Sequence, residues 1–165
     1  MKVATGLAIG TFANPELAAK AVESAMLKAN IHAPSSVLLF LTSEFAADPQ
    51  SAIKAAAKAA SCTQIIGCSA TGIFTEEDWV IDSPAAAAMV FSDLNFSHAN
   101  SDNNDLLLTL TAPNAINTTW LNSTGLNNVG SRFGGVSGDA IGQGQFSVWQ
   151  NGKGNTQGYC EVALP

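Results

Sequence analysis

Two short loops of small residues are the parts of this sequence best suited to bind a ligand. Each loop follows an apolar run and combines backbone N–H groups, small polar side chains and little bulk. The first contributes Gly67, Cys68, Ser69, Thr71 and Gly72, and the second contributes Gly135, Ser137 and Asp139. Exposed amides in glycine-rich loops bind anions and polar groups, and hydroxyls add donors and acceptors. We therefore expect one ligand site shared by the two loops.

Arg132 is the only arginine of the chain and lies two residues before Gly134. A guanidinium group can hold a carboxylate through two parallel hydrogen bonds. At the mouth of the second loop it would grip an anionic ligand, while Asp139 would orient the guanidinium or bind an amine. The alternative is an Arg132 side chain that is simply exposed on a strand, as arginine commonly is.

Cys68 is a candidate nucleophile, because a thiol beside loop amides can have a lowered pKa. No base can be identified near it, and free cysteine is often a small buried packing residue. Ser69 lies in a stretch one residue too long for the nucleophile elbow of serine hydrolases. No nucleotide-binding motif is complete. We expect a protein that is not an enzyme, with a Cys68-dependent hydrolase or transferase as an alternative.

The elements that position the first loop follow from helix caps and apolar spacing. Asn14-Pro15-Glu16 is typical of a helix start, and apolar residues recur at helical spacing as far as Asn30. A strand should precede this helix, within residues 1–10. The next elements should be a strand at 37–41, a helix at 52–60 whose start is marked by Asp48-Pro49-Gln50, a strand at 62–67, an excursion of two strands at 74–82 and a strand at 85–91.

The second half of the chain repeats this order. It should contain a strand at 106–110, a helix at 116–121, a strand at 130–136 and a hairpin of strands 145–149 and 158–164 that turns at 151–154. Repeats that cannot bury their apolar faces alone pack against each other. We therefore predict a single domain over 1–165 with an internal repeat at about 36–92 and 105–165. Its class is α/β, a layered domain of two similar β-α-β-β units with a mixed sheet or sheets and pseudo-twofold symmetry.

Composition narrows the class of partner. Seven Lys and Arg against thirteen Asp and Glu give a formal net charge of −6, which disfavours nucleic acid. No basic amphipathic stretch or long apolar run favours a membrane. Three cysteines favour a reducing compartment, and the first residues lack the apolar core of a secretory signal. We expect a cytoplasmic protein whose partner is a small molecule.

Three segments carry a resemblance to a known family. They are residues 66–72 (IGCSATG), residues 133–139 (FGGVSGD) and the turn region 147–152 (SVWQNG). Their order, together with the helix at 14–30 and the strand at 37–40, resembles the N-terminal module of the FIST family, the F-box and intracellular signal-transduction proteins. The resemblance covers nearly the whole chain. It implies an intracellular sensory domain that binds a small ligand, for which amino acids have been proposed.

The resemblance turns the two-loop site into a specific expectation. The ligand would be an amino acid or another small carboxylate, with its carboxylate on Arg132 and its amine on Asp139. Some relatives are described as haem-binding nitric-oxide sensors, so a haem-based sensor with His98, His32 or Cys68 as axial ligand is the alternative. Family proteins usually continue into a C-terminal module. That module, or a separate signalling protein, is the expected macromolecular partner.

Overall fold

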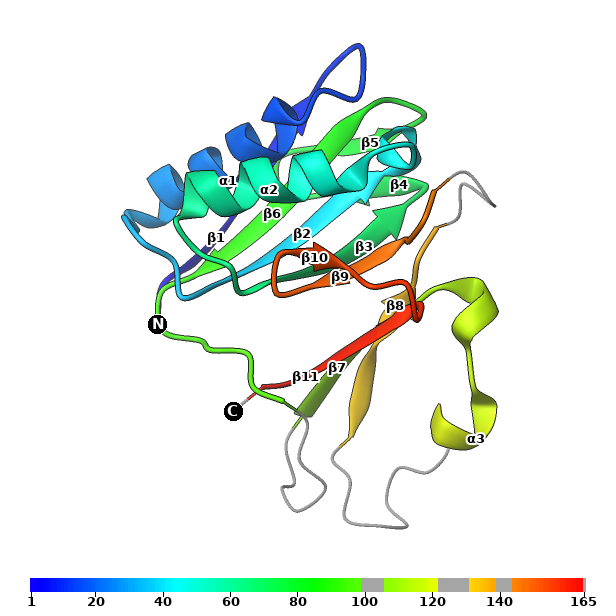
Figure 1. Cartoon of the computed structure of the whole chain (residues 1–165). Helices are drawn as coiled ribbons and strands as arrows, with labels where there is room; N and C mark the ends of the chain where they lie inside the picture. The colour runs from blue at the N-terminus through cyan, green and yellow to red at the C-terminus, as the bar shows by residue number, and fades with distance from the viewer. Residues whose placement is uncertain (99–105, 122–130, 139–143, 165) are drawn as a thin grey trace.

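The computed structural model describes residues 1–98, 106–121, 131–138 and 144–164, the last two residues of 106–121 by their backbone alone (Figure 1). The helices and strands are β1 (Val3–Ile9), α1 (Glu16–Ala29), β2 (Ser36–Thr42), α2 (Pro49–Ala60), β3 (Ile65–Ala70), β4 (Gly72–Phe74), β5 (Trp79–Ile81), β6 (Ala85–Phe91), β7 (Leu106–Thr111), α3 (Thr118–Leu121), β8 (Arg132–Val136), β9 (Val148–Gln150), β10 (Lys153–Gly154) and β11 (Tyr159–Leu164). Single 3₁₀ turns follow β2 and β7 at 43–45 and 113–115.

Six strands in the order β1-β6-β2-β3-β9-β10 form the larger sheet, in which only β2 and β3 run parallel to each other. Both long helices cover one of its faces (Figure 1). The helices start where the sequence predicts. Asn14 Oδ1 accepts a hydrogen bond from the Glu16 N–H at 3.0 Å, and Asp48 Oδ1 accepts one from the Ser51 N–H at 3.2 Å. These acceptors satisfy N–H groups that the first helical turn leaves unpaired.

The opposite face of the larger sheet is covered by a second sheet and a hairpin. The second sheet has the order β11-β7-β8. Apolar side chains from both sheets form one buried cluster between them: Ile66, Cys68 and Val148 from the larger sheet, and Leu108, Leu110, Cys160 and Val162 from the smaller one. The molecule therefore has three layers, with helices outside, the larger sheet in the middle and the smaller sheet on the far side.

The same pattern of strand pairing occurs in both halves of the chain. In the first half β2 pairs with β3 in parallel and with β6 antiparallel. In the second half β7 pairs with β8 in parallel and with β11 antiparallel. The predicted fold class, a layered α/β fold built from two similar units with mixed sheets, is therefore confirmed.

The predicted hairpin of strands 145–149 and 158–164 is wrong. The turn at Asn151 and Gly152, with φ angles of 53° and 72°, instead joins β9 to the two-residue β10. Two successive residues with positive φ are typical of a type I′ turn, which joins two strands that follow each other directly in a short hairpin. Trp149 pairs with Gly67 of β3, so β9 extends the larger sheet, while β11 returns to β7. The arrangement buries apolar side chains, because Val148 and Trp149 are fully buried when β9 lies beside β3.

Two element boundaries also differ from the prediction. The strand expected at 62–67 runs from Ile65 to Ala70, so Cys68 and Ser69 lie within the strand and not in the loop. The helix expected at 116–121 is the single turn Thr118–Leu121.

None of the helices within the described ranges is long and apolar enough to cross a membrane.

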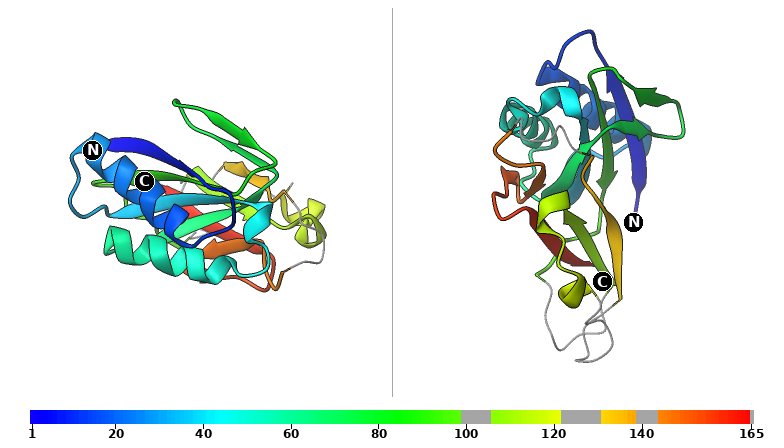
Figure 2. Two further views of the ribbon diagram at one scale, coloured as in Figure 1. Left: turned by 90° about the horizontal axis from the view of Figure 1, so that it is seen from above. Right: turned by 90° about the vertical axis from the view of Figure 1, so that its right-hand side faces the viewer.

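The β4–β5 hairpin packs on the side of the larger sheet away from the helices (Figure 2). Ile73 and Val80 point inward and are buried, whereas Phe74 and Trp79 are exposed. At its tip, the Lys28 Nζ of α1 lies 3.2 Å from a Glu76 oxygen and 2.5 Å from a Glu77 oxygen. Trp79 therefore belongs to an exposed excursion, and an ionic contact around the β1 edge links that excursion to α1.

Candidate ligand-binding site

The two small-residue loops meet where β3 and β8 end. The Gly138 N–H donates to the Ser69 carbonyl oxygen at 2.9 Å, and Ser69 Oγ donates to the Gly138 carbonyl oxygen at 3.0 Å. A Cβ atom on Gly138 would lie 2.4 Å from the Thr71 nitrogen, so only glycine permits this approach. The predicted meeting of the loops is confirmed, whereas their role in binding a ligand stays a prediction.

Ser137 and Ser147 extend this junction to the segment before β9. The Ser137 N–H donates to the Thr111 carbonyl oxygen at 2.7 Å. The Ser137 hydroxyl lies 2.7 Å from the Ser147 hydroxyl. The Ser69 N–H donates to the Ser147 carbonyl oxygen at 2.8 Å. The Ser69 hydroxyl therefore joins the two halves of the chain, whereas the Ser137 hydroxyl links two segments of the second half, and both side chains are buried.

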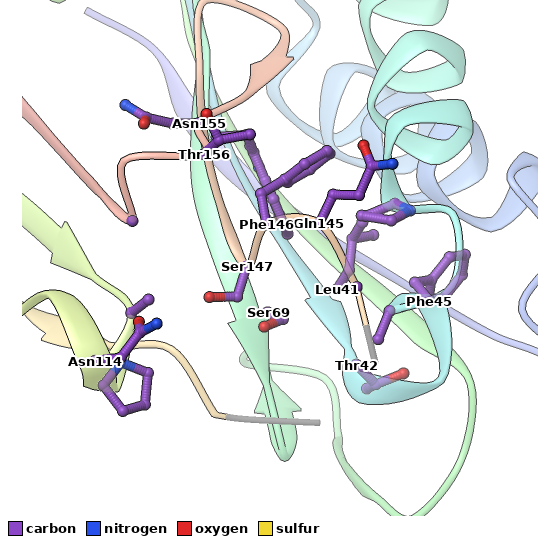
Figure 3. A pocket seen from close by; sticks show the side chains of 17 residues that line it. Leu41, Thr42, Phe45, Ser69, Asn114, Gln145, Phe146, Ser147, Asn155 and Thr156 are labelled. Atoms are coloured by element: carbon purple, nitrogen blue, oxygen red, sulfur yellow. The ribbon is translucent and has the colours of Figure 1, made fainter. Parts of the chain in front are cut away.

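A cavity of about 280 Å³ opens beside this junction, at the carboxyl ends of β2 and β3 (Figure 3). Ligands of α/β proteins commonly bind at the carboxyl ends of parallel strands, in concave sites with a few polar groups. The cavity walls come from both halves of the chain. They include the end of β2 and the following turn, the start of α2, the turn after β7, and the segments that lead into β9 and β11.

The inner wall of the cavity is apolar. Leu41, Phe45 and Trp149 continue the core beneath the helices, and Phe146 packs against that core. Trp149 is fully buried, and its Nε1 has no hydrogen-bond partner among the described residues. A Cβ atom on Gly67 would lie 2.6 Å from that nitrogen, so the glycine makes room for the indole ring. Gly67 therefore contributes to the wall indirectly, by leaving room for the Trp149 ring.

The described residues at the mouth of the cavity are polar and uncharged. Asn114, Gln145 and Thr156 come from three separate segments and are exposed. Their side chains make no hydrogen bond within the described part of the chain, which leaves them available to a ligand. Sequence reasoning missed all three because none lies in a motif. One available signal was the repeat itself, since Thr42 at the end of β2 and Ala112 just after β7 both line the cavity, and β2 and β7 are corresponding strands of the two halves.

Arg132 lies at the start of β8, at the opposite end of the strand from Ser137. Its Nε donates to Glu161 Oε2 at 2.7 Å, and the same oxygen accepts from Thr109 Oγ1 at 2.6 Å. The Arg132 and Glu161 side chains are only 9% and 13% exposed. The structure therefore places the guanidinium in an ion pair away from the two-loop junction.

The other residues expected at the site are dispersed. Gly72 lies in β4, and a Cβ atom on Gly135 would have no neighbour within 4 Å. Thr71 is exposed beside Gly138, and Asp139 lies outside the described residues. The sequence suggested nine residues, and all but Asp139 are described. Of those described, only Ser69 lines the cavity.

Cys68 points into the cluster between the two sheets and is 5% exposed. Burial raises the pKa of its thiol to about 12, and burial is also the main cause that raises the pKa of Cys160 to about 12. The thiolate is the reactive form, so the environment of Cys68 opposes a role as nucleophile.

We predict that Cys68 reacts slowly with iodoacetamide in the folded protein. A pKa about 3 units above the ordinary value of 9.0 lowers the thiolate fraction near neutral pH by about 1,000-fold. Cys62 is half-buried and should react first, which provides an internal control. Mass spectrometry of timed digests measures the order. Labelling of Cys68 before Cys62 would instead support the alternative of a Cys68-dependent hydrolase or transferase.

The described lining of this cavity does not fit a haem. An axial ligand to haem iron comes from histidine, cysteine, methionine or tyrosine. His32 and His98 are exposed, Cys68 faces the cluster between the sheets, and none of the four types occurs in the described lining of the cavity. The haem alternative gains no support from this site.

The sequence profile of the FIST N domain matches residues 35–164. The chain belongs to the FIST family. The match spans both repeat units and all the described cavity-lining residues, which lie between Leu41 and Gly158, whereas β1 and α1 precede it. No curated protein matches the chain. FIST domains form a family of sensory domains in signal transduction and are not typically enzymes.

Proposed function

We propose that this FIST domain is the ligand-binding unit of a sensory system and that its ligand occupies the cavity at the carboxyl ends of β2 and β3. The observation that carries the proposal is that the cavity walls come from both repeat units. The wall from the first unit includes Leu41 and Ser69, and the wall from the second includes Asn114 and Thr156. A ligand bound there contacts both halves at once.

Such a ligand would stabilise one arrangement of the two units over others. A ligand shifts a conformational equilibrium only by as much as its affinity differs between the states. The hydrogen bond of Ser69 with Gly138 links the first unit to the second beside the cavity, so ligand contacts with both units add to it. We propose that the resulting change is read by a C-terminal module or a separate signalling protein. The three free cysteines support a cytoplasmic setting.

The proposal predicts that a ligand raises the thermal stability of the wild-type chain and not that of a cavity variant. The test is a thermal-shift panel of amino acids, small carboxylates, nucleobases, neutral amides and haemin. A ligand at 100 times its Kd stabilises the folded state by about 2.7 kcal/mol. The double variant Asn114→Ala/Gln145→Ala should lose most of that effect, because it removes exposed side chains at the mouth without disturbing the core.

Asn95→Ala provides the matched control. Asn95 is also exposed, and it lies at the other end of β2, next to Leu94, whose carbonyl oxygen accepts from Ser36 Oγ at 2.6 Å. This variant should respond to the ligand as the wild type does. Equal stabilisation of all three proteins would place the ligand elsewhere and contradict the proposal.

A further inference from the structure

The described lining of the cavity carries no ionisable charge. Of the 17 residues that line it, none is Asp, Glu, Lys, Arg or His. Arg132, the one arginine, is held by Glu161 at the far end of β8. A ligand in this cavity therefore meets hydroxyls, carboxamides, backbone groups and apolar side chains (Figure 3).

The start of α2, which borders the cavity at Pro49, does not supply a positive charge either. A free helix N-terminus attracts anions through its unpaired N–H groups. Here Asp48 already occupies that position, and its carboxylate accepts hydrogen bonds from the N–H and the hydroxyl of Ser51. Interaction with Ser51 is the main cause that lowers the Asp48 pKa, so the carboxylate is ionised at neutral pH and repels an anion.

These features determine which ligands the site tolerates. Burying a charged group without an opposite charge costs several kcal/mol, whereas a neutral polar group needs only hydrogen bonds. Asn114 and Gln145 each offer a carbonyl oxygen and an NH₂ group, so together they match a partner that both donates and accepts. Phe146 is half-buried and offers aromatic surface to the rest of the ligand, and the buried rings of Phe45 and Trp149 back the apolar wall.

We propose that the cavity selects an uncharged ligand with a flat apolar body and one polar edge that both donates and accepts hydrogen bonds, such as a carboxamide or a lactam. The proposal rests on the function proposed above and departs from the expected free amino acid or small carboxylate. The volume of about 280 Å³ suits a compact molecule, because ligand cavities usually span about 300–1,000 Å³.

Three probes of one shape and different charge test the proposal: benzamide, benzoate and benzylamine. Each is titrated at neutral pH against the full chain, with binding followed by NMR chemical-shift changes in the protein and by saturation transfer to the probe. Benzamide should bind at least about 10-fold more tightly than the two charged probes. Gln145→Ala and Asn114→Ala should each weaken benzamide binding, whereas Asn95→Ala should not.

The possible outcomes separate the ligand class from the function. Tighter binding of benzoate or benzylamine, weakened by the same mouth variants, overturns the uncharged class and leaves the small-ligand site standing. A preference for benzylamine would assign a carboxylate to the site, either Asp48 next to Pro49 or one outside the described residues. If no probe binds at any concentration reached, the inference is wrong, and the metabolite panel then decides the proposed function independently. Benzamide binding that neither Gln145→Ala nor Asn114→Ala weakens also overturns the inference.

Discussion

Gly134→Ala is expected to destabilise the protein by on the order of 3 kcal/mol or more. Gly134 has a φ angle of 147°, a backbone conformation that residues with a side chain rarely adopt. A Cβ atom there would lie 1.7 Å from the carbonyl oxygen of Thr109, its partner across the β7–β8 pair. The strands must separate to relieve this contact, and Ser137 and Gly138 at the end of β8 then lose their anchor.

The neighbouring residue supplies the control for this prediction. A Cβ atom on Gly135 would have nothing within 4 Å, so Gly135→Ala should change the free energy of unfolding by less than about 0.5 kcal/mol. Urea denaturation followed by fluorescence measures both variants. Similar stability of the two variants would contradict the β7–β8 pairing described here. Loss of ligand binding in a stable Gly135→Ala protein would support the ligand contact that the sequence suggested for Gly135.

Arg132→Met is expected to lower the free energy of unfolding by about 3 kcal/mol. Removal of the guanidinium leaves the Glu161 carboxylate, which is 13% exposed, without the cation that lies 2.7 Å from it. Breaking a largely buried ion pair costs more than the pair contributes, because one charge stays behind unpaired. If Arg132 instead served a ligand, the variant would keep its stability and lose only carboxylate binding.

A double variant separates these two explanations. Arg132→Met/Glu161→Met removes both charges and replaces them with apolar side chains of similar length, so it should recover much of the stability lost by the single variant. Urea denaturation of the wild type, both single variants and the double variant gives the coupling energy. An Arg132→Met protein as stable as the wild type would contradict the structural role of the ion pair.

Local signals in the sequence were sufficient for most elements of the fold. Helix caps such as Asn14 and Asp48 set the starts of α1 and α2, and apolar runs marked β2 and β7, because caps and runs act over a few residues. The twofold repeat followed from the order of these elements. It correctly brought Ser69 and Gly138 together, since corresponding strands end at corresponding places.

Pairing between distant segments was harder to predict. The turn at Asn151 and Gly152 suggests a hairpin, but it cannot show that Trp149 is needed beside Gly67 in another sheet. Arg132 illustrates the same difficulty for the site. Its place beside the glycine pair suggested a ligand contact, whereas its actual partner, Glu161, lies on a strand that the sequence assigned to a different pairing.

The place of β9 has a consequence for how the molecule folds. β9 and β10 follow β8 in the chain but complete the sheet of the first half, whereas β11 returns to the sheet of the second half. The halves are therefore interlocked, and neither sheet is complete until residues after 148 have joined it. Pairings between distant segments slow folding. Before β9 arrives, β3 has an unpaired edge that can recruit other chains. We expect slow folding, in which partly folded chains without β9 aggregate through the edge of β3.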